Sequence, residues 1–159
     1  EDLHKYTKKQ INVKRLVFIA SVLFFALGCT PEYGQRNPYL QEVRFSVELN
    51  LNLPAYAPLQ QVGNPVLITT TGVGTQGVYV INTGFDQFRA FEAACPNHAP
   101  NTCSLLKLSG QNGVCGCEGY TYTLFTGQML ERPNDGKRYY DLLSYQAELF
   151  ANTLRVYQP

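Results

Sequence analysis

The sequence has 159 residues, which is room for one domain or for one domain with a short extension. Only 16% of the residues are charged and 13% are aromatic, and there are 13 glycines and no tryptophan. This composition suits twisted sheets and turns better than helices, and a net charge of +1 gives no basic surface that would support nucleic-acid binding.

The N-terminal segment has the pattern of an export signal. The basic pair Lys14-Arg15 precedes an uninterrupted apolar run over 16–27, which is followed by a glycine and Cys29. Such a run is too short to span a bilayer but is typical of a secretory signal. Its end resembles a lipobox, although Ala26 stands where leucine is usual. We therefore predict that 1–28 is a signal peptide and that Cys29 is lipidated.

The first twelve residues fit this signal poorly. The chain begins with Glu1, and its only methionine is Met129. Translation from Val13 through a non-standard start codon would produce a compact signal that begins Met-Lys-Arg-Leu. On that interpretation, 1–12 is an upstream extension that does not belong to the protein.

Residues 29–41 are polar and carry two prolines and a glycine, so they predict a lipidated linker. Five of the 13 basic and two of the 12 acidic residues precede Cys29, which leaves eight basic and ten acidic residues and a net charge of about −2. Lipid on Cys29 would hold the following domain at a membrane. We expect an exported protein anchored to the outer membrane, with another envelope protein as its partner.

Residues 42–159 carry the signals of an all-β domain. Apolar and polar residues alternate strictly from Val43 to Leu53, as in a half-buried strand. A turn over 82–87 predicts a hairpin, and the glycines of 72–77, with no helix after them, predict a hairpin turn. Shorter strands are predicted at 65–69, 78–81, 88–91, 120–125, 139–145 and 153–157. Many short strands without helical periodicity indicate a small antiparallel barrel or sandwich.

Two cysteine segments lie between these strands, Cys95-Pro-Asn-His98 and Cys115-Gly-Cys-Glu-Gly-Tyr120. With their surroundings over roughly 62–158, they resemble the Rieske family. The matching residues are Val78–Ile81, Gly84, Phe88–Phe91, Cys95-Pro96, Gly119–Tyr122, Thr126-Gly127 and Pro133. The resemblance implies a Rieske-like fold with a cysteine-containing two-loop subdomain. In that family, the loops C-x-H and C-x-x-H-G hold a [2Fe–2S] cluster, with two thiolates on one iron and two imidazoles on the other.

The resemblance also implies which ligand positions this chain retains. Cys95 and Cys115 take the thiolate positions, whereas Asn97 and Glu118 stand at the two imidazole positions. His98 is displaced by one residue, and the only other histidine precedes the predicted cleavage site. We therefore predict that no cofactor is bound. The alternative is a variant [2Fe–2S] cluster on Cys95, Cys115, His98 and Glu118.

Some Rieske proteins brace their two loops with a disulfide, and the resemblance places Cys117 at one of the bracing positions, with Cys103 as candidate partner. Four cysteines allow three connectivities, of which Cys115 with Cys117 would close a cramped ring. Two connectivities remain. One pairs Cys95 with Cys115 and Cys103 with Cys117, and the crossed one pairs Cys95 with Cys117 and Cys103 with Cys115. We favour the first, because loops that hold two thiolates on one metal bring the sulfurs within about 4 Å.

A zinc site is a further metal hypothesis, with Cys95, His98, Cys115 and Cys117 as its ligands, although the C-x-C spacing is tight for such a site. No hydrolase, metalloprotease or nucleotide-binding motif is present, and Glu92 and Glu118 are interpreted as surface or loop carboxylates rather than a catalytic pair. We predict that the protein is not an enzyme and has no small-molecule substrate.

The predicted function is that of a cluster-free Rieske-like envelope lipoprotein. It would act as a structural or protein-binding module, or as an accessory subunit of a membrane-associated complex. The alternative function is electron transfer through the variant cluster.

Overall fold

The computed structural model describes residues 36–159, so the predicted signal peptide and Cys29 lie outside the described residues. Within 36–159, no helix is both long and apolar enough to cross a membrane. The compact unit runs from Asn37 to Pro159 and so begins five residues before the predicted boundary at 42. Its first residues pack on the domain, because Leu40 is buried and the Asn37 amide donates to the Pro96 carbonyl.

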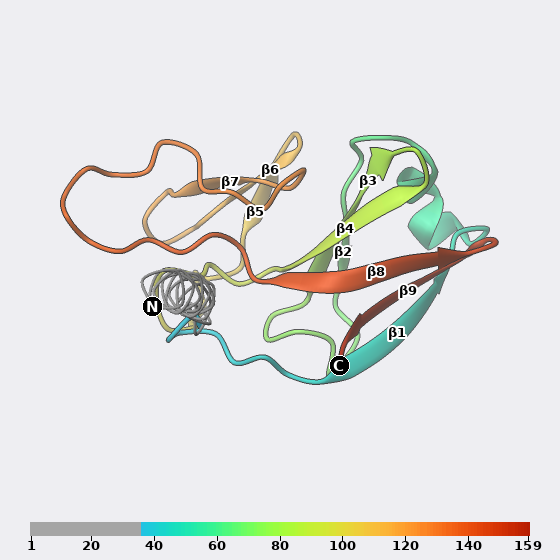
Figure 1. Cartoon of the computed structure of the whole chain (residues 1–159), viewed down its shortest axis with the longest axis horizontal. Coiled ribbons are helices and arrows are strands. Elements are labelled where there is room, and N and C mark those ends of the chain that lie inside the picture. The colour runs from blue at the N-terminus through green and yellow to red at the C-terminus, as the bar shows by residue number, and fades with distance from the viewer. Residues whose placement is uncertain (1–35) are drawn as a thin grey trace, which may run out of the picture. The chain divides into compact units, whose positions relative to one another are not determined.

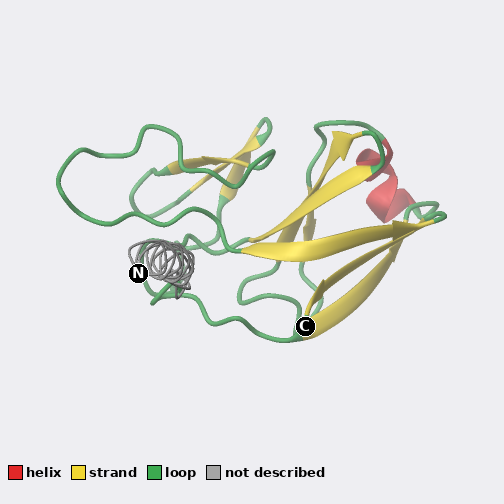
Figure 2. Cartoon of the chain, in the orientation of Figure 1, coloured by secondary structure: helices red, strands yellow, loops and turns green. Residues whose placement is uncertain are grey.

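The described residues form two antiparallel sheets, which confirms the prediction of an all-β fold (Figures 1 and 2). The larger sheet has the strand order β1-β9-β8-β4-β3-β2, and the smaller has the order β5-β6-β7. The strands of the larger sheet are β1 (Phe45–Asn50), β2 (Val66–Ile68), β3 (Val78–Gly84), β4 (Gln87–Glu92), β8 (Ser144–Phe150) and β9 (Thr153–Gln158). The smaller sheet consists of β5 (Lys107–Ser109), β6 (Asn112–Val114) and β7 (Thr121–Thr123).

The larger sheet is curled around a hydrophobic core to which each of its strands contributes. The buried residues include Leu49, Ile68, Val78, Val80, Ala90, Tyr145, Leu154 and Val156. Leu49 of β1 lies opposite Leu154 of β9, so the alternation in 43–53 buries the side of the strand that was expected. The strand is shorter than predicted, because it ends at Asn50 and a 3-10 helix, η1 (Pro54–Gln60), begins with a proline.

Strand β3 is shared between two cores, which explains its continuous apolar sequence. Val78 and Val80 face the core of the curled sheet, whereas Tyr79 and Ile81 face a second core. The second core lies under the smaller sheet and contains both Cys95 and Cys115. The cysteine loops therefore rest on the back of a strand that is buried on both faces.

Two predicted turns are present. In the hairpin between β3 and β4, Phe85 and Asp86 have φ of 54° and 56°, as a tight two-residue turn requires. The glycine-rich segment 72–77 connects β2 and β3, which pair antiparallel.

The predicted strand over 139–145 is wrong for most of its length, because β8 begins only at Ser144. The amides of Tyr140 and Leu142 bond instead to Asn97 and Gly127.

Glu92 corrects another expectation, since it is not a surface or loop carboxylate. The side chain is fully buried, at 0% exposure, at the end of β4. It accepts hydrogen bonds from the amides of Thr75, Gln76 and Ala94 at 2.7, 3.0 and 3.0 Å, and from the Tyr145 hydroxyl at 2.6 Å. The glycine loop is thus folded around a buried anion, and burial together with that anion raises the pKa of Tyr145.

Candidate metal centre

The candidate site is built on two loops that follow β4 and β6. In the first loop, the Cys95 amide donates to the Ser104 carbonyl at 2.8 Å, which folds the loop back on itself. In the second, the amides of Cys115 and Gly119 donate to the Tyr120 and Cys115 carbonyls, at 2.8 and 3.0 Å. Gly119 has a φ of +76°, which favours glycine. The second loop is therefore a tight turn, the first is a longer loop closed at its ends, and together they bring Cys95 and Cys115 into one group.

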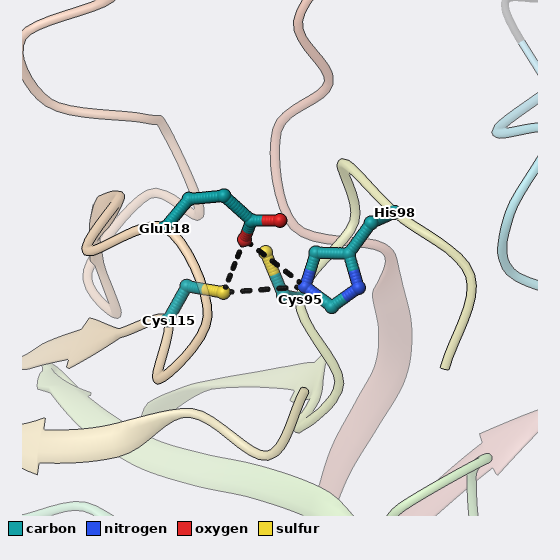
Figure 3. A group of neighbouring side chains, drawn as sticks. All are labelled: Cys95, His98, Cys115 and Glu118. Carbon is teal, nitrogen blue, oxygen red and sulfur yellow. Dashed lines mark hydrogen bonds and ion pairs between the residues drawn. The ribbon is translucent and has the colours of Figure 1, made fainter. Parts of the chain in front are cut away.

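Four side chains converge where the two loops meet (Figure 3). Cys95, His98, Cys115 and Glu118 each offer one ligand atom, and all four atoms lie within 4.8 Å of one another. Cys115 Sγ lies 3.0 Å from Glu118 Oε2 and 3.3 Å from His98 Nε2, and the last two atoms are 3.2 Å apart. These are the four residues that the variant-cluster alternative named.

A disulfide between Cys103 and Cys117 ties the first loop to the second, with an S–S distance of 2.07 Å. This bridge is one of the two in the favoured connectivity. The Cβ of any other residue at Gly116 would lie 2.8 Å from the Cys103 carbonyl oxygen, so the close approach of the loops depends on that glycine. The disulfide brings the loops together without using the two buried cysteines.

The second expected bridge, Cys95–Cys115, is not formed, and both residues are buried free cysteines in the structure. The thiols interact instead with polar neighbours. Cys115 contacts His98 and Glu118, and Cys95 Sγ lies 3.6 Å from the Tyr122 hydroxyl. The zinc hypothesis also needs correction in one ligand, since the Cys117 sulfur is taken up by the disulfide and the carboxylate of Glu118 lies in the group instead.

Asn97 does not belong to the convergent group. Its amide nitrogen donates to the Tyr122 hydroxyl at 2.8 Å and to the Tyr140 carbonyl at 2.9 Å. Its side-chain oxygen accepts from the Tyr140 amide at 2.8 Å. The residue therefore fastens the first loop to the segment before β8, and both ends of its side chain are occupied by hydrogen bonds.

The orientation of the His98 ring is set by contacts of Nδ1, the ring nitrogen that does not face Cys115 and Glu118. Nδ1 lies 3.0 Å from the Ala99 carbonyl oxygen and 3.4 Å from Ser104 Oγ. Because a carbonyl oxygen can only accept a hydrogen bond, Nδ1 carries the proton. Nε2, on the other side of the ring, lies 3.3 Å from Cys115 Sγ and 3.2 Å from Glu118 Oε2.

The pKa of the Cys115 thiol is raised to about 12, first by burial and then by hydrogen bonds with Cys95 and Glu118. The backbone amides of Glu118 and Cys117 oppose this effect. The thiol is therefore protonated near neutral pH and donates to the Glu118 carboxylate. Burial likewise raises the pKa of Tyr122, which is fully buried beneath the loops.

Two residues have roles that were not predicted from the sequence. Tyr122 was expected to be a core residue, and Asn97 was noted only as a departure from the family pattern. The structure joins them in one network, because the Asn97 amide donates to the same hydroxyl that contacts Cys95. No sequence signal indicates this contact, since the two residues are separated by 25 positions and come from different elements.

The chain matches no family model and no curated protein. Solved structures of similar fold include one of the oxygenase–ferredoxin complex of carbazole 1,9a-dioxygenase, with 20% identity, a TM-score of 0.46 and coverage of 74% of this chain and 95% of that chain. Another is the plasma membrane Rieske protein of the cyanobacterium Synechocystis, with 22% identity, a TM-score of 0.45 and coverage of 63% and 91%. A third is a ferredoxin of Sphingomonas yanoikuyae, with 16% identity, a TM-score of 0.43 and coverage of 62% and 89%. At these identities the likeness concerns the fold alone.

Proposed function

We propose that the protein is a lipid-anchored envelope module whose Rieske-like domain holds no [2Fe–2S] cluster and serves a structural or protein-binding role. The observation that carries this proposal is the donor set where the two loops meet. A Rieske cluster needs two imidazoles on one iron, whereas 36–159 contain a single histidine, His98. Asn97, which we place at the first imidazole position, has both ends of its side chain engaged in hydrogen bonds.

The spacing of the four ligand atoms supports the same proposal. A two-iron core separates the ligands of one iron from those of the other. Here, His98 Nε2 and Glu118 Oε2 lie only 3.3 and 3.0 Å from Cys115 Sγ. Atoms that would have to bind different irons are therefore in direct contact. A carboxylate in place of a neutral imidazole would also add negative charge to that iron.

The chemistry of the buried groups supports a non-catalytic role. A nucleophilic cysteine needs a lowered pKa, whereas that of Cys115 is raised to about 12. The Glu92 carboxylate already accepts four hydrogen bonds and has no room for a substrate. We therefore propose that the domain acts by binding another envelope protein rather than by transforming a small molecule.

The proposed anchor restricts where that partner can be. The compact unit begins at Asn37, so only residues 30–36 separate it from Cys29. Seven residues reach at most about 25 Å, and a protein bound by this domain would lie close to the outer membrane. This localisation rests on the signal-like sequence before Cys29.

The proposal is tested on the full chain, expressed with its N-terminal segment and purified anaerobically in detergent from the membrane fraction. We expect a colourless protein without acid-labile sulfide. A red-brown protein that contains iron and sulfide in equal amounts would refute the cluster-free state. For the anchor, the variant Cys29→Ser is expected to leave the membrane fraction, and Thr30→Ser, at the next residue, is the matched control. Retention of Cys29→Ser in the membrane would contradict lipidation at this residue.

A further inference from the structure

We propose that Cys95, His98, Cys115 and Glu118 bind one zinc ion in a closed four-ligand site. The inference rests on the proposed cluster-free state, since the same residues cannot hold a single ion and a two-iron core at once. Zinc accepts thiolate, imidazole and carboxylate ligands in one tetrahedral site. With four protein ligands, the site leaves no position open for a substrate, so the ion would be structural.

The distances between the ligand atoms fit a single ion. Zinc bonds of about 2.0–2.3 Å at tetrahedral angles place the ligand atoms about 3.2–3.8 Å apart. The three distances among Cys115 Sγ, His98 Nε2 and Glu118 Oε2 are 3.0, 3.3 and 3.2 Å. Cys95 completes the set from the other loop, with all four atoms inside 4.8 Å. A small closure on the Cys95 side, together with a slight widening between Cys115 Sγ and Glu118 Oε2, would bring the set to the dimensions of a zinc site.

The charge distribution also favours a cation at this place. His98 Nε2 and the Glu118 carboxylate oxygen lie 3.2 Å apart, so a cation placed between them would contact two ligand atoms at once. A proton could bridge that one pair of atoms. A divalent ion at the centre of the group would also reach the sulfurs of Cys95 and Cys115, and its charge would offset most of the charge of two thiolates and one carboxylate.

The residues around the ligands are arranged as they commonly are around a bound metal. His ligands usually donate their second ring N–H to a carbonyl or carboxylate, and His98 Nδ1 lies 3.0 Å from the Ala99 carbonyl oxygen. The Tyr122 hydroxyl accepts from Asn97, so its own proton is free to point at Cys95 Sγ. Such a hydrogen bond to sulfur would stabilise a thiolate, the form that binds zinc.

The two loops are held in place without the ion. The Cys103–Cys117 disulfide joins them directly, and Asn97 fastens the first loop to Tyr140. Binding therefore requires little reorganisation. When the two thiols coordinate zinc, two protons leave the site and no electron is transferred, so neither an oxidant nor a reductant is required.

The experiment uses the full chain in detergent, stripped of metal with a chelator but without reducing agent, so that the Cys103–Cys117 disulfide stays intact. Zinc is titrated in, and bound metal is counted by mass spectrometry after desalting. Cobalt(II) is used as a coloured probe of the same site. We expect one zinc per chain, and a cobalt spectrum with tetrahedral d–d bands and sulfur-to-metal charge transfer.

Two ligand variants and one matched control make the assignment specific. Glu118→Gln is nearly isosteric at a residue 36% exposed, so the fold should survive. It is expected to weaken zinc binding by about tenfold or more, and His98→Ala should do the same while also altering the cobalt spectrum. Glu42→Gln changes an exposed carboxylate outside the site and should bind as the parent does. Circular dichroism establishes that each variant is folded.

The outcomes separate this inference from the proposed function. A colourless protein that binds no zinc, or one that binds it equally well after both ligand changes, overturns the zinc site alone. A Cys95–Cys115 disulfide found by peptide mapping in the chelator-treated chain overturns it too. Iron and labile sulfide in the purified chain would instead refute the cluster-free state on which the inference rests.

Discussion

Two polar centres lie close together along the chain, because Glu92 ends β4 and Cys95 follows three residues later, but they are built in different ways. At Glu92, four donors surround one carboxylate. Where the cysteine loops meet, four potential ligand atoms converge on one another, and Cys115 Sγ, His98 Nε2 and Glu118 Oε2 contact one another within the group. The first arrangement is electrostatically complete with protein atoms alone. For the second, we propose that a zinc ion completes the group.

This difference separates a carboxylate that holds the fold from a set of side chains that can bind a ligand. Burial alone does not define the difference, since Cys95 and Cys115 are buried as Glu92 is, whereas Glu118 is exposed. The distinction lies in the balance of donors and acceptors, because a buried acceptor without donors is costly. The following changes test that distinction by removing one element of each centre, in order of decreasing effect on stability.

The largest effect is expected for Glu92→Ala. Three amides and the Tyr145 hydroxyl would lose their acceptor inside the protein, and each buried unsatisfied donor costs about 1–3 kcal/mol. We expect the free energy of unfolding in urea to fall by about 4 kcal/mol or more. Glu118→Ala, measured in the metal-free protein, is the comparison and should lower it by less than about 1 kcal/mol. Equal losses at the two positions would show that the centres do not differ as described.

The next effect is expected from opening the Cys103–Cys117 disulfide in the double variant Cys103→Ser/Cys117→Ser. The cysteines are 14 positions apart, and closing a loop of that length stabilises a protein by about 3 kcal/mol. Urea unfolding of the double variant and of the parent under oxidising conditions measures the loss. If the parent and the double variant unfolded at the same urea concentration, the disulfide would not be what holds the loops together.

Asn97→Ala should have an intermediate effect. It removes three hydrogen bonds that link the first loop to Tyr122 and Tyr140, and we expect a loss of about 2 kcal/mol. Asn64→Ala is the matched control, because that exposed side chain bonds only to Gln61 at 3.2 Å. Hydrogen exchange at the Tyr140 amide, which donates to Asn97, should accelerate in the first variant alone. Unchanged exchange there would contradict the role given to Asn97.

The smallest effect on stability is expected for Tyr122→Phe, which removes one hydroxyl and keeps the ring. The change leaves the Asn97 amide with one acceptor fewer, and a loss of about 1 kcal/mol is expected. Tyr157→Phe, whose hydroxyl bonds to the exposed Glu148, is the control and should be nearly neutral. Zinc affinity should fall in the first variant only, because the same hydroxyl contacts Cys95 Sγ. Equal zinc affinity in both variants would show that the Tyr122 hydroxyl does not contribute to zinc binding.

Much of the larger sheet could be predicted from local patterns. Alternation over 43–53 indicated a half-buried strand, and 78–81 was predicted as a short strand, which the structure buries on both faces. The tight turn at Phe85 and Asp86 was marked by its turn residues. Strands β5 and β6 were missed, since each has three residues and too few apolar positions to show a period. The 139–145 strand was placed too early because tyrosine favours strands, while hydrogen bonds to other segments hold this part of the chain.

For the site, the sequence determined the residues and the tertiary structure decided their partners. The segments Cys95–His98 and Cys115–Glu118 stand out by residue type and spacing, because few other residue types bind metals. Which cysteines bond to each other depends on how two loops from different strands approach, and that approach depends on Gly116 and on the shared strand β3. The buried state of Glu92 was decided in the same way. A carboxylate is tolerated inside a protein only where distant donors meet it, and no local pattern in the sequence records that meeting.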